Sequence, residues 1–363
     1  MGFLKRYWGR ILGGICLAVA ASAGLMWWMM TQPMYQPGDV RAGRNVSGPL
    51  VPPAQMAGET WQMQPGISLH HFANGAGRNV LVLHGGPGIP TPTAWPGLDR
   101  LGGRYRFHYF DQRGCGTSSR PFDRFASKNY YENAIRLERT LGLGALIADV
   151  ERIRRITGDD RAIVVGHSFG GVLAALYAAE FPDHVAALVL IGPASVLKMP
   201  APGGDLFTQV RDRLPAGARE GYNHWLKGTF DFGHIFEKSE SDLVAEQIQF
   251  FDYYRTAFGA ALPPMAENTT GIGGWGGRAA FFSLGRRHDW RGALRPVTAP
   301  VLVIHGSRDL QPEASSRLYA EAFPNAQFKV IQGAQSLSAD RQAGRVRQVS
   351  GGVPASARAV KLG

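Results

Sequence analysis

The chain contains only two cysteines, and this scarcity excludes a fold that depends on disulfide bonds. Cys16 lies in an apolar N-terminal run and Cys115 in a glycine-rich turn, so the two are not expected to pair. Motifs that bind metals or phosphates are also missing, because the sequence has no His-Glu-x-x-His, no Cys/His cluster and no P-loop. The sequence therefore predicts a protein without a metal ion or an organic cofactor.

Charged residues make up 18% of the 363 residues and hydrophobic residues 45%, which is typical of a globular protein. Most of the formal net charge of +11 lies at the two ends, before the first apolar run and in residues 337–363. The middle has no stripe of Lys and Arg interleaved with aromatic residues. We therefore expect no nucleic-acid partner, and the sequence leaves the oligomeric state open.

Residues 11–30 form an apolar run of twenty residues without a charge. A helix of that length is about 30 Å long, which matches the hydrocarbon thickness of a bilayer. The run follows three basic residues, Lys5, Arg6 and Arg10. Such a basic flank stays in the cytoplasm, so the sequence predicts an N-terminal transmembrane anchor with the rest of the chain exported.

Two other interpretations of this run stay open. Ala21-Ser22-Ala23 is a possible cleavage site, which would make the protein secreted after signal cleavage. The run could also be a buried globular helix. We expect a signal anchor over residues 1–30 and, because Pro, Gly and Gln then dominate without periodicity, a linker over residues 31–60.

Short apolar runs alternate with helical stretches from Trp61 onward. The runs expected to be strands are residues 79–84, 106–110, 161–166, 186–191, 300–305 and 327–331. Helices are expected between them, most clearly at 136–156 and 171–181. This alternation predicts an α/β fold with a mostly parallel central sheet and helices on both faces, whose ligand site lies at the carboxyl ends of the strands.

The segment between the fourth and fifth of these strands breaks the pattern, and at about a hundred residues it is too long for a loop. It contains a helical stretch at 245–258 and a glycine-rich segment at 271–277. We expect it to form a helical cap insertion over the active site. The expected domains are a core over 61–194 and 294–335, a cap over 195–293 and an atypical tail over 336–363.

Gly166-His167-Ser168-Phe169-Gly170 lies between a predicted strand and a predicted helix, the context that a nucleophile elbow requires. Gly166 and Gly170 leave room for the tight turn that exposes the serine Oγ. The N–H of Phe169 lies at the helix N-terminus, where it can stabilise a developing negative charge. The motif predicts Ser168 as a catalytic nucleophile.

A second glycine turn, His84-Gly85-Gly86-Pro87-Gly88, follows the first predicted strand. The N–H of Gly86 is expected to complete an oxyanion hole together with the N–H of Phe169. His84 and Gly85 are expected to shape the turn, and a proton-transfer role for His84 is the alternative.

The next predicted strand is followed by Asp111-Gln112-Arg113 and a glycine-rich turn. Asp111 and Arg113 are expected to organise the loops at the edge of the site through ion pairs and backbone hydrogen bonds. The alternatives are a direct catalytic role for these residues and a reactive thiol at Cys115.

Asp309 closes the motif His-Gly-Ser-Arg-Asp after the strand predicted at 300–305. A carboxylate in this place can orient a catalytic histidine and stabilise its imidazolium form. Taken alone, Asp309 could instead cap a helix that starts near Pro312. Combined with the serine motif, the catalytic interpretation is favoured.

Taken together, the motifs HGGPG, DQRGCGTS, GHSFGG and HGSRD resemble the prolyl iminopeptidase family of α/β-hydrolases over roughly residues 61–334. The resemblance implies an α/β-hydrolase fold and removal of an N-terminal proline from a small peptide through a serine acyl-enzyme. It implies Ser168 as nucleophile, Asp309 as acid, and the N–H groups of Gly86 and Phe169 as the oxyanion hole. An esterase or lactonase on the same scaffold stays open.

The sequence departs from this family in the cap. Many prolyl iminopeptidases carry a Trp-Glu pair there, whose carboxylate holds the ammonium group of the substrate. Here Leu226 follows Trp225, so the carboxylate is missing at that place. Other cap acids that could substitute for it are Glu220, Asp231 and Glu237.

A second departure concerns the catalytic base. Ser336 stands where the family has the triad histidine, and all ten histidines precede Asp309. Without a base, Ser168 is a weak nucleophile. Three explanations stay open: a reading-frame shift near residues 334–335, a catalytically dead and membrane-tethered binding protein, or a relocated histidine such as His288.

Overall fold

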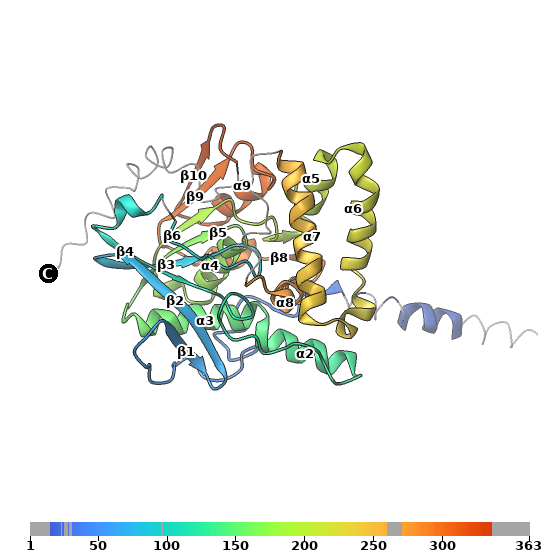
Figure 1. Cartoon of the computed structure of the whole chain (residues 1–363), viewed down its shortest axis with the longest axis horizontal. Coiled ribbons are helices and arrows are strands. Elements are labelled where there is room, and N and C mark those ends of the chain that lie inside the picture. The colour runs from blue at the N-terminus through green and yellow to red at the C-terminus, as the bar shows by residue number, and fades with distance from the viewer. Residues whose placement is uncertain are drawn as a thin grey trace, which may run out of the picture.

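The computed structural model describes residues 15–22, 24, 28, 31–95, 97–259 and 271–335. In this part of the chain eight strands form one sheet in the order β1-β2-β4-β3-β5-β6-β9-β10 (Figure 1). The strands are β1 (Thr60–Gln64), β2 (Ile67–Gly75), β3 (Arg78–Leu83), β4 (Tyr105–Phe110), β5 (Ala162–His167), β6 (Val185–Ile191), β9 (Val301–Gly306) and β10 (Ala326–Ile331). Strands β4, β3, β5, β6, β9 and β10 run parallel to their neighbours, whereas β1 and β2 pair antiparallel at one edge of the sheet. The predicted mostly parallel sheet is therefore confirmed.

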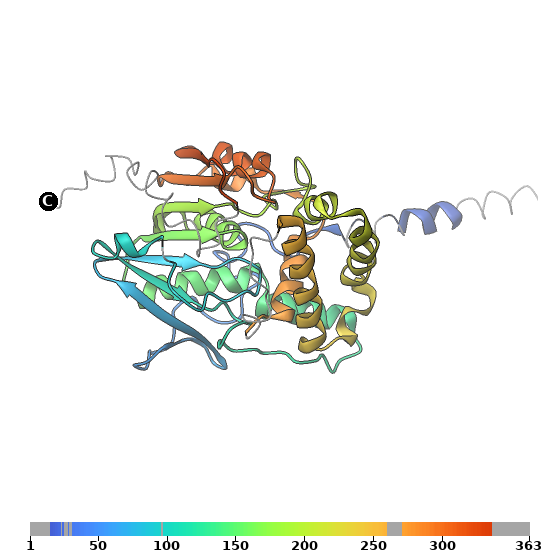
Figure 2. The same ribbon diagram turned by 45° about the horizontal axis from the view of Figure 1, so that its top comes forward.

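The described α-helices are α2 (Tyr130–Leu141), α3 (Leu143–Ile156), α4 (Phe169–Glu180), α5 (Leu206–Arg213), α6 (Ala216–Thr229), α7 (Glu240–Phe258), α8 (Gly274–Leu284) and α9 (Glu313–Ala322). Shorter elements are the 3₁₀ turns η1 (Asp99–Leu101), η2 (Pro182–His184), η3 (Phe232–Glu237) and η5 (Arg291–Leu294), and the small hairpin of β7 (Lys198–Met199) and β8 (His288–Asp289). Helices α5, α6 and α7 stand together at one end of the sheet (Figures 1 and 2).

Helix α4 is the centre of the main hydrophobic core. Its sequence is apolar on every side, and a helix of that kind must be buried all round. All twelve of its residues are buried, between the sheet and helix α3. The helix that carries Ser168 at its N-terminus is therefore fixed by packing in every direction.

The helix expected over 136–156 is two helices, α2 and α3, which meet at Gly142. Gly142 has an extended backbone, and a Cβ there would collide with the carbonyl oxygen of Glu138. The glycine permits this break, which turns α2 away from the sheet toward α8.

Helices cover the two faces of the sheet unequally. Helices α3, α4 and α9 share the main core on one face. On the other face, β3, β4 and β5 pack against η1 and the segment that contains Trp95 and Leu98. We expected helices on both faces, but in the described ranges only η1 lies on this second face. The connection between β3 and β4 is rich in Pro and Gly, which prevent a longer helix there.

Residues 31–46 form a strap that packs on the core, although the sequence predicted a loose linker over 31–60. Tyr35 and Val40 of the strap are buried in the main core. The carboxylate of Glu180, at the end of α4, accepts hydrogen bonds from the Tyr35 hydroxyl (2.8 Å) and from the N–H groups of Gly38 (2.7 Å) and Arg41 (3.0 Å). Contacts made by backbone N–H groups do not require a periodic pattern of apolar residues. The sequence of the segment therefore resembles that of a linker.

The first residues of the strap are tied to helix α8 and the turn after it. The N–H of Met34 donates to the Phe282 carbonyl, and the N–H of Arg286 donates to the Thr31 carbonyl (2.9 Å). The packed domain thus begins at residue 31. Most of the expected anchor over residues 1–30 lies outside the described residues, as does the tail over 336–363. Among the residues described, no helix has the length and apolarity needed to cross a membrane.

Glu180→Gln should detach the strap from the end of α4. The amide keeps one acceptor oxygen but places an NH₂ group against N–H donors, so we expect a loss of about 1–3 kcal/mol in the free energy of unfolding. Thermal unfolding measures this loss, and limited proteolysis should cut the variant within residues 31–46 first. The exposed Glu321→Gln is the control. Equal protease resistance of both variants would show that Glu180 does not hold the strap.

Candidate active site

Ser168 occupies a sharp turn between β5 and α4. Its backbone angles are φ 52° and ψ −117°, which a non-glycine residue adopts only when its surroundings impose them. The N–H of Ser168 donates to the Ile191 carbonyl (3.0 Å), and its own carbonyl accepts from Ala194 (3.1 Å). The end of β6 and the segment after it therefore bind both the N–H and the carbonyl of the strained residue.

The glycines around Ser168 are required by close backbone contacts. A Cβ on Gly166 would collide with the carbonyl oxygen of Gly170, and a Cβ on Gly170 with that of Leu83. A Cβ placed on Gly85 would lie 3.1 Å from the Cβ of Ser168. The turn after β3 thus lies directly against the predicted nucleophile.

Both predicted oxyanion donors lie close to Ser168 along the chain or in space: Phe169 follows it directly, and Gly86 follows Gly85, which lies against it. Gly86 has φ +120°, a conformation that favours glycine. Phe169 is the first residue of α4, so its N–H has no acceptor within the helix. Among the described residues, neither N–H group forms a hydrogen bond, and the positive end of the α4 dipole lies at the same place.

Asp309 follows β9 and reaches the same edge of the sheet. A Cβ on Gly192, the residue after β6, would lie 2.8 Å from Oδ2 of Asp309. Strand β6 lies between β5 and β9, so Gly192 separates the Ser168 turn from the Asp309 carboxylate. The structure thus brings Ser168, Gly86, Phe169 and Asp309 to one end of the sheet.

The Asp309 carboxylate is buried, with 5% of the residue exposed. Oδ1 accepts a hydrogen bond from the N–H of Gln311 (2.9 Å), and Arg213 donates to the Asp309 backbone carbonyl (3.2 Å). Burial raises the pKa of Asp309 to about 7, against the smaller opposing effects of the Gln311 and Leu310 N–H groups and of Arg213. A histidine partner would stabilise the charged form, and none of the described histidines contacts this carboxylate.

Three of the described histidines, His84, His305 and His288, are held in other roles. His84 Nδ1 lies 2.9 Å from the Gly85 carbonyl, and His84 Nε2 accepts the N–H of Gln112 (3.0 Å). Burial lowers the pKa of His84, so the neutral ring joins the two loops as a structural link. His305 bonds to Ser316, and both ring nitrogens of His288 lie within 2.9 Å of backbone carbonyls.

The residues before position 336 run along β9, beside the Asp309 loop. The N–H of Arg308 donates to the Ala334 carbonyl (2.8 Å). A Cβ on Gly306 would lie 2.5 Å from the carbonyl oxygen of Gln335. Ser336 itself lies outside the described residues. The last described residue is therefore next to the loop that carries Asp309.

Asp111 and Arg113 stabilise loops and do not contact Ser168. Asp111 accepts the N–H of Thr117 (3.0 Å) within its own turn. Arg113 is buried and forms an ion pair with Asp149 of α3, with Nε 2.6 Å from Oδ2. Cys115 is buried beside them, and burial raises the pKa of its thiol, which argues against a reactive thiolate.

The cap acids considered as partners for a substrate ammonium group lie in unsuitable places. Glu220, Asp231 and Glu237 are exposed, and Glu237 bonds to His234. Glu246, whose backbone carbonyl accepts the Trp225 indole N–H, is neutralised by two cations, Arg278 and Lys238. Of these acids, the three candidates are therefore exposed to solvent, and Glu246 is already paired with cations.

Two polar residues that sequence reasoning missed connect distant parts of the site. Gln247 of α7 donates to the Pro87 carbonyl (2.9 Å), which ties the cap to the oxyanion turn. The carboxylate of Glu240 accepts the N–H groups of Gly274 and Trp275 at the start of α8. A single amide or acid on a helix carries no sequence pattern that could have revealed these partners.

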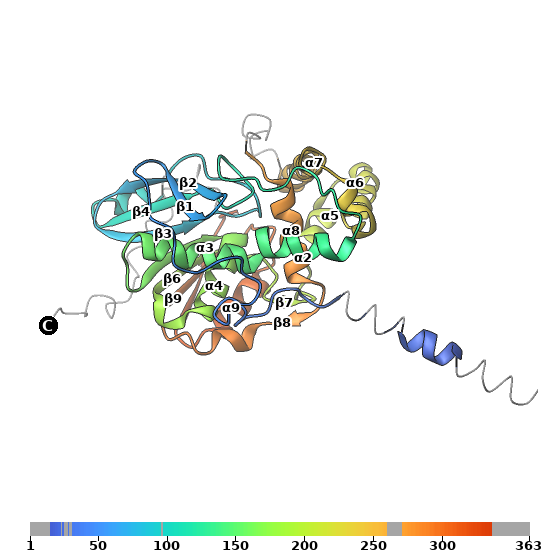
Figure 3. The same ribbon diagram turned by 90° about the horizontal axis from the view of Figure 1, so that it is seen from below.

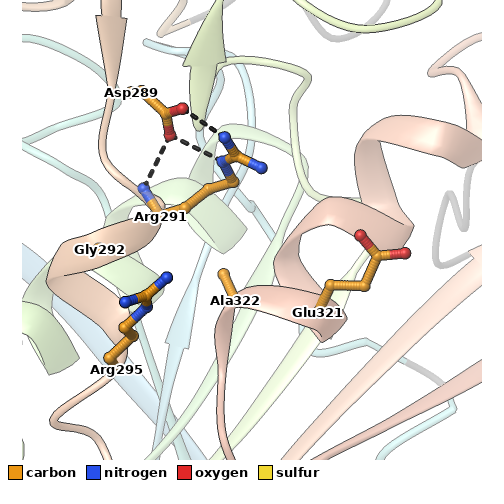
Figure 4. A pocket seen from close by; sticks show the side chains of 6 residues that line it. All are labelled: Asp289, Arg291, Gly292, Arg295, Glu321 and Ala322. Atoms are coloured by element: carbon orange, nitrogen blue, oxygen red, sulfur yellow. Dashed lines mark hydrogen bonds and ion pairs between the residues drawn. The ribbon is translucent and has the colours of Figure 1, made fainter.

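A separate polar hollow of about 300 Å³ lies between η5 and α9 (Figure 4). Its lining residues are Asp289, Arg291, Gly292, Arg295, Glu321 and Ala322. Arg291 forms a two-point ion pair with Asp289, which lowers the pKa of that carboxyl to about 2. The hollow contains none of the predicted site residues, so it is not the candidate active site.

Known proteins share the fold of this chain. The alpha/beta hydrolase fold family matches residues 78–338. A proline iminopeptidase of Neisseria meningitidis is 26% identical over 282 residues, which cover 71% of this chain and 83% of the relative.

Two solved structures share the fold. The proline iminopeptidase of Mycobacterium smegmatis aligns with a TM-score of 0.53 at 18% identity, over 78% of this chain and 93% of the other. An esterase from Exiguobacterium antarcticum aligns with a TM-score of 0.54 at 19% identity, over 79% and 92%.

Asp309→Asn should make stability less dependent on pH. The folded acid has a pKa of about 7 and the unfolded acid one near its ordinary value, so ionisation favours unfolding as pH rises between them. The neutral amide removes this effect and keeps an oxygen for the Gln311 N–H. We expect the variant to be more stable than the parent at pH 8, by at most about 4 kcal/mol, and to gain much less at pH 5.

Denaturant unfolding at the two pH values measures the difference. The same substitution in a Ser336→His chain is the control, because a histidine partner stabilises the carboxylate and should abolish the gain. An equal gain at pH 5 and pH 8 would contradict a raised pKa at Asp309.

Proposed function

The chain belongs to the alpha/beta hydrolase fold family, and on that premise we propose that it is built as a serine hydrolase in which Ser168 forms the acyl-enzyme. One observation carries the proposal: the strained Ser168 turn lies against the Gly85–Gly86 turn and, across Gly192, the Asp309 carboxylate. In this proposal the arrangement would supply a nucleophile, two N–H donors and an acid at one edge of the sheet. Serine acyl transfer uses such groups together with a base.

In the proposed reaction Ser168 Oγ attacks the carbonyl carbon of a peptide or ester. The carbonyl oxygen becomes an oxyanion that the N–H groups of Gly86 and Phe169 stabilise. A base must take the proton from Oγ and return it to the leaving group, and Asp309 would orient that base. Water then attacks the acyl-enzyme and releases Ser168. Ser336 cannot act as this base, so we expect the chain as given to retain only residual activity.

Ser336→His should restore the base. We expect a fluorophosphonate probe to label Ser168 about 10³-fold faster in this variant than in the chain as given. Labelling followed by mass spectrometry measures the rate and the modified residue. Ser338→His, the same substitution two residues further on, is the matched control, and Ser168→Ala should abolish labelling.

Fast labelling of Ser168 in the chain as given would show that another group activates the serine. A folded Ser336→His chain that reacts no faster than the Ser338→His control would contradict the proposed place of the base. Resequencing of the gene around codons 334–335 tests the separate hypothesis of a reading-frame shift. An in-frame histidine in the corrected sequence supports that hypothesis, and an unchanged sequence refutes it.

For the substrate class we propose peptides with an N-terminal proline, as in the named relatives. The similarity to the Neisseria meningitidis proline iminopeptidase and the shared motifs support this specificity. The second candidate is an ester or lactone. It is favoured by the cap, where the candidate carboxylates are exposed or neutralised and aromatic residues gather in a cluster with Trp225, Phe207 and Phe250.

The Ser336→His chain can separate these two substrates. Hydrolysis of a prolyl aminocoumarin amide with little hydrolysis of nitrophenyl butyrate supports the peptidase. The reverse ratio supports the esterase. A folded Ser336→His chain that hydrolyses neither substrate would support the third alternative, a membrane-tethered binding protein without catalysis.

For the location we propose that residues 11–30 anchor the protein in a membrane and that the hydrolase domain lies on the exported side. The uncharged run and its basic flank support this proposal. Secretion after cleavage at Ala21-Ser22-Ala23 is the alternative. Mass spectrometry of the N-terminus of the mature protein distinguishes the two.

A further inference from the structure

The strap determines how far the folded domain can lie from a membrane that holds residues 11–30. A flexible linker over residues 31–60 would have let the domain move freely. Instead the Thr31 carbonyl accepts a hydrogen bond from the N–H of Arg286, and Tyr35 is buried in the core. Only the chain at the junction of residues 30 and 31 separates the apolar run from the packed domain, and consecutive Cα atoms are only 3.8 Å apart. The surface around Thr31 must then lie near the lipid headgroups.

The N-terminal end of α2 belongs to the same surface. The Phe282 carbonyl accepts the N–H of Met34, and the Phe282 ring lies 6.3 Å from the ring of Tyr130. Figures 1 and 3 show the start of the strap and this end of α2 at the same end of the molecule. Segments about a hundred residues apart in sequence therefore surround the point where the chain enters the domain.

The residues exposed there have the chemistry of a membrane-contacting surface. Tyr131 has 72% of its surface exposed and Tyr130 has 39%, although both are large aromatic residues. Tyrosine prefers the headgroup region, where its ring and its hydroxyl are both satisfied. The exposed cations of this surface are Lys128, Arg286 and Arg287. Two acids lie nearby: Glu132 accepts a hydrogen bond from Ser127, and Glu237, which follows Phe236 beside Tyr130, is bonded to His234.

We propose that this entry face, formed by Lys128, Tyr130, Tyr131, Arg286 and Arg287 around Thr31, docks on the headgroups of an anionic bilayer. The inference rests on the proposed anchor but not on the proposed catalysis. Lys and Arg side chains are attracted to an anionic lipid surface, and the tyrosines set how deeply the entry face lies in the headgroup region. The domain is then held in one orientation on the membrane, with the amino edge of β4 and η1 directed away from it.

The full chain reconstituted into vesicles tests this orientation. In a Cys16→Ala background, Tyr131→Cys carries a fluorophore on the entry face, since the remaining Cys115 is buried. Gly103→Cys is the matched distal site, because Gly103 is exposed and a Cβ there has no atom within 4 Å. With a quencher attached to the lipid headgroups, we expect quenching at Tyr131→Cys to be about threefold stronger than at Gly103→Cys.

The charges are tested by reversal in the same background. Lys128→Glu with Arg286→Glu should reduce quenching at Tyr131→Cys about twofold in vesicles with about 30% phosphatidylglycerol, and little in pure phosphatidylcholine. Arg100→Glu with Arg104→Glu makes the same charge change on exposed residues at the distal edge and should have no effect. Circular dichroism and thermal unfolding show whether each variant is folded like its parent.

The outcomes separate the two proposals. A chain that does not float with vesicles lacks the anchor, and this result overturns the proposed entry face as well. A chain that floats but shows equal quenching at both labels keeps the anchor and overturns the entry face. Quenching that is strong at Tyr131→Cys but unchanged by charge reversal and by phosphatidylglycerol overturns the anionic part of the proposal. None of these results depends on labelling of Ser168.

Discussion

The close approach of three backbone segments at Ser168 is the constraint on which the candidate site depends. Strand β5, the start of α4 and the turn after β3 come so near that a side chain on Gly166 or Gly170 would collide with a neighbouring carbonyl. The buried helix α4 cannot shift to relieve this crowding, because all its residues are packed. The strained Ser168 backbone is therefore a consequence of the core as much as of the turn.

Much of the sheet and of the candidate site could be predicted from sequence, because these features depend on residues that are close together in the chain. The central parallel strands are buried on both faces, so they appear as continuous apolar runs, and their expected ranges differ from β3, β4, β5, β6, β9 and β10 by about one residue at each end. The elbow and the turn at Gly86 are also local, because both depend on glycines within a few positions. The antiparallel hairpin of β1 and β2 was missed because His70-His71-Phe72-Ala73-Asn74 lacks an alternating pattern.

Other features could not be predicted because their partners are distant in sequence. The strap is held largely by backbone N–H groups that almost any sequence could supply, such as that of Gly38, which donates to a carboxylate 142 residues away. Gln247 reaches Pro87 across the cap, 160 residues apart. The absence of a histidine beyond Asp309, in contrast, is visible in the sequence at once. The structure adds its physical effect, a buried carboxyl group whose pKa burial raises to about 7.

The contact between the strap and Glu180 also has a consequence for the order of events during synthesis. Residues 31–46 leave the ribosome long before α4 exists, so their hydrogen-bond acceptor is not yet made when they emerge. The strap must wait in an open form until the first half of the sheet and α4 have been produced, and contacts of this range slow folding. The N-terminal segment, first to be synthesised, is therefore among the last parts of the domain to become ordered.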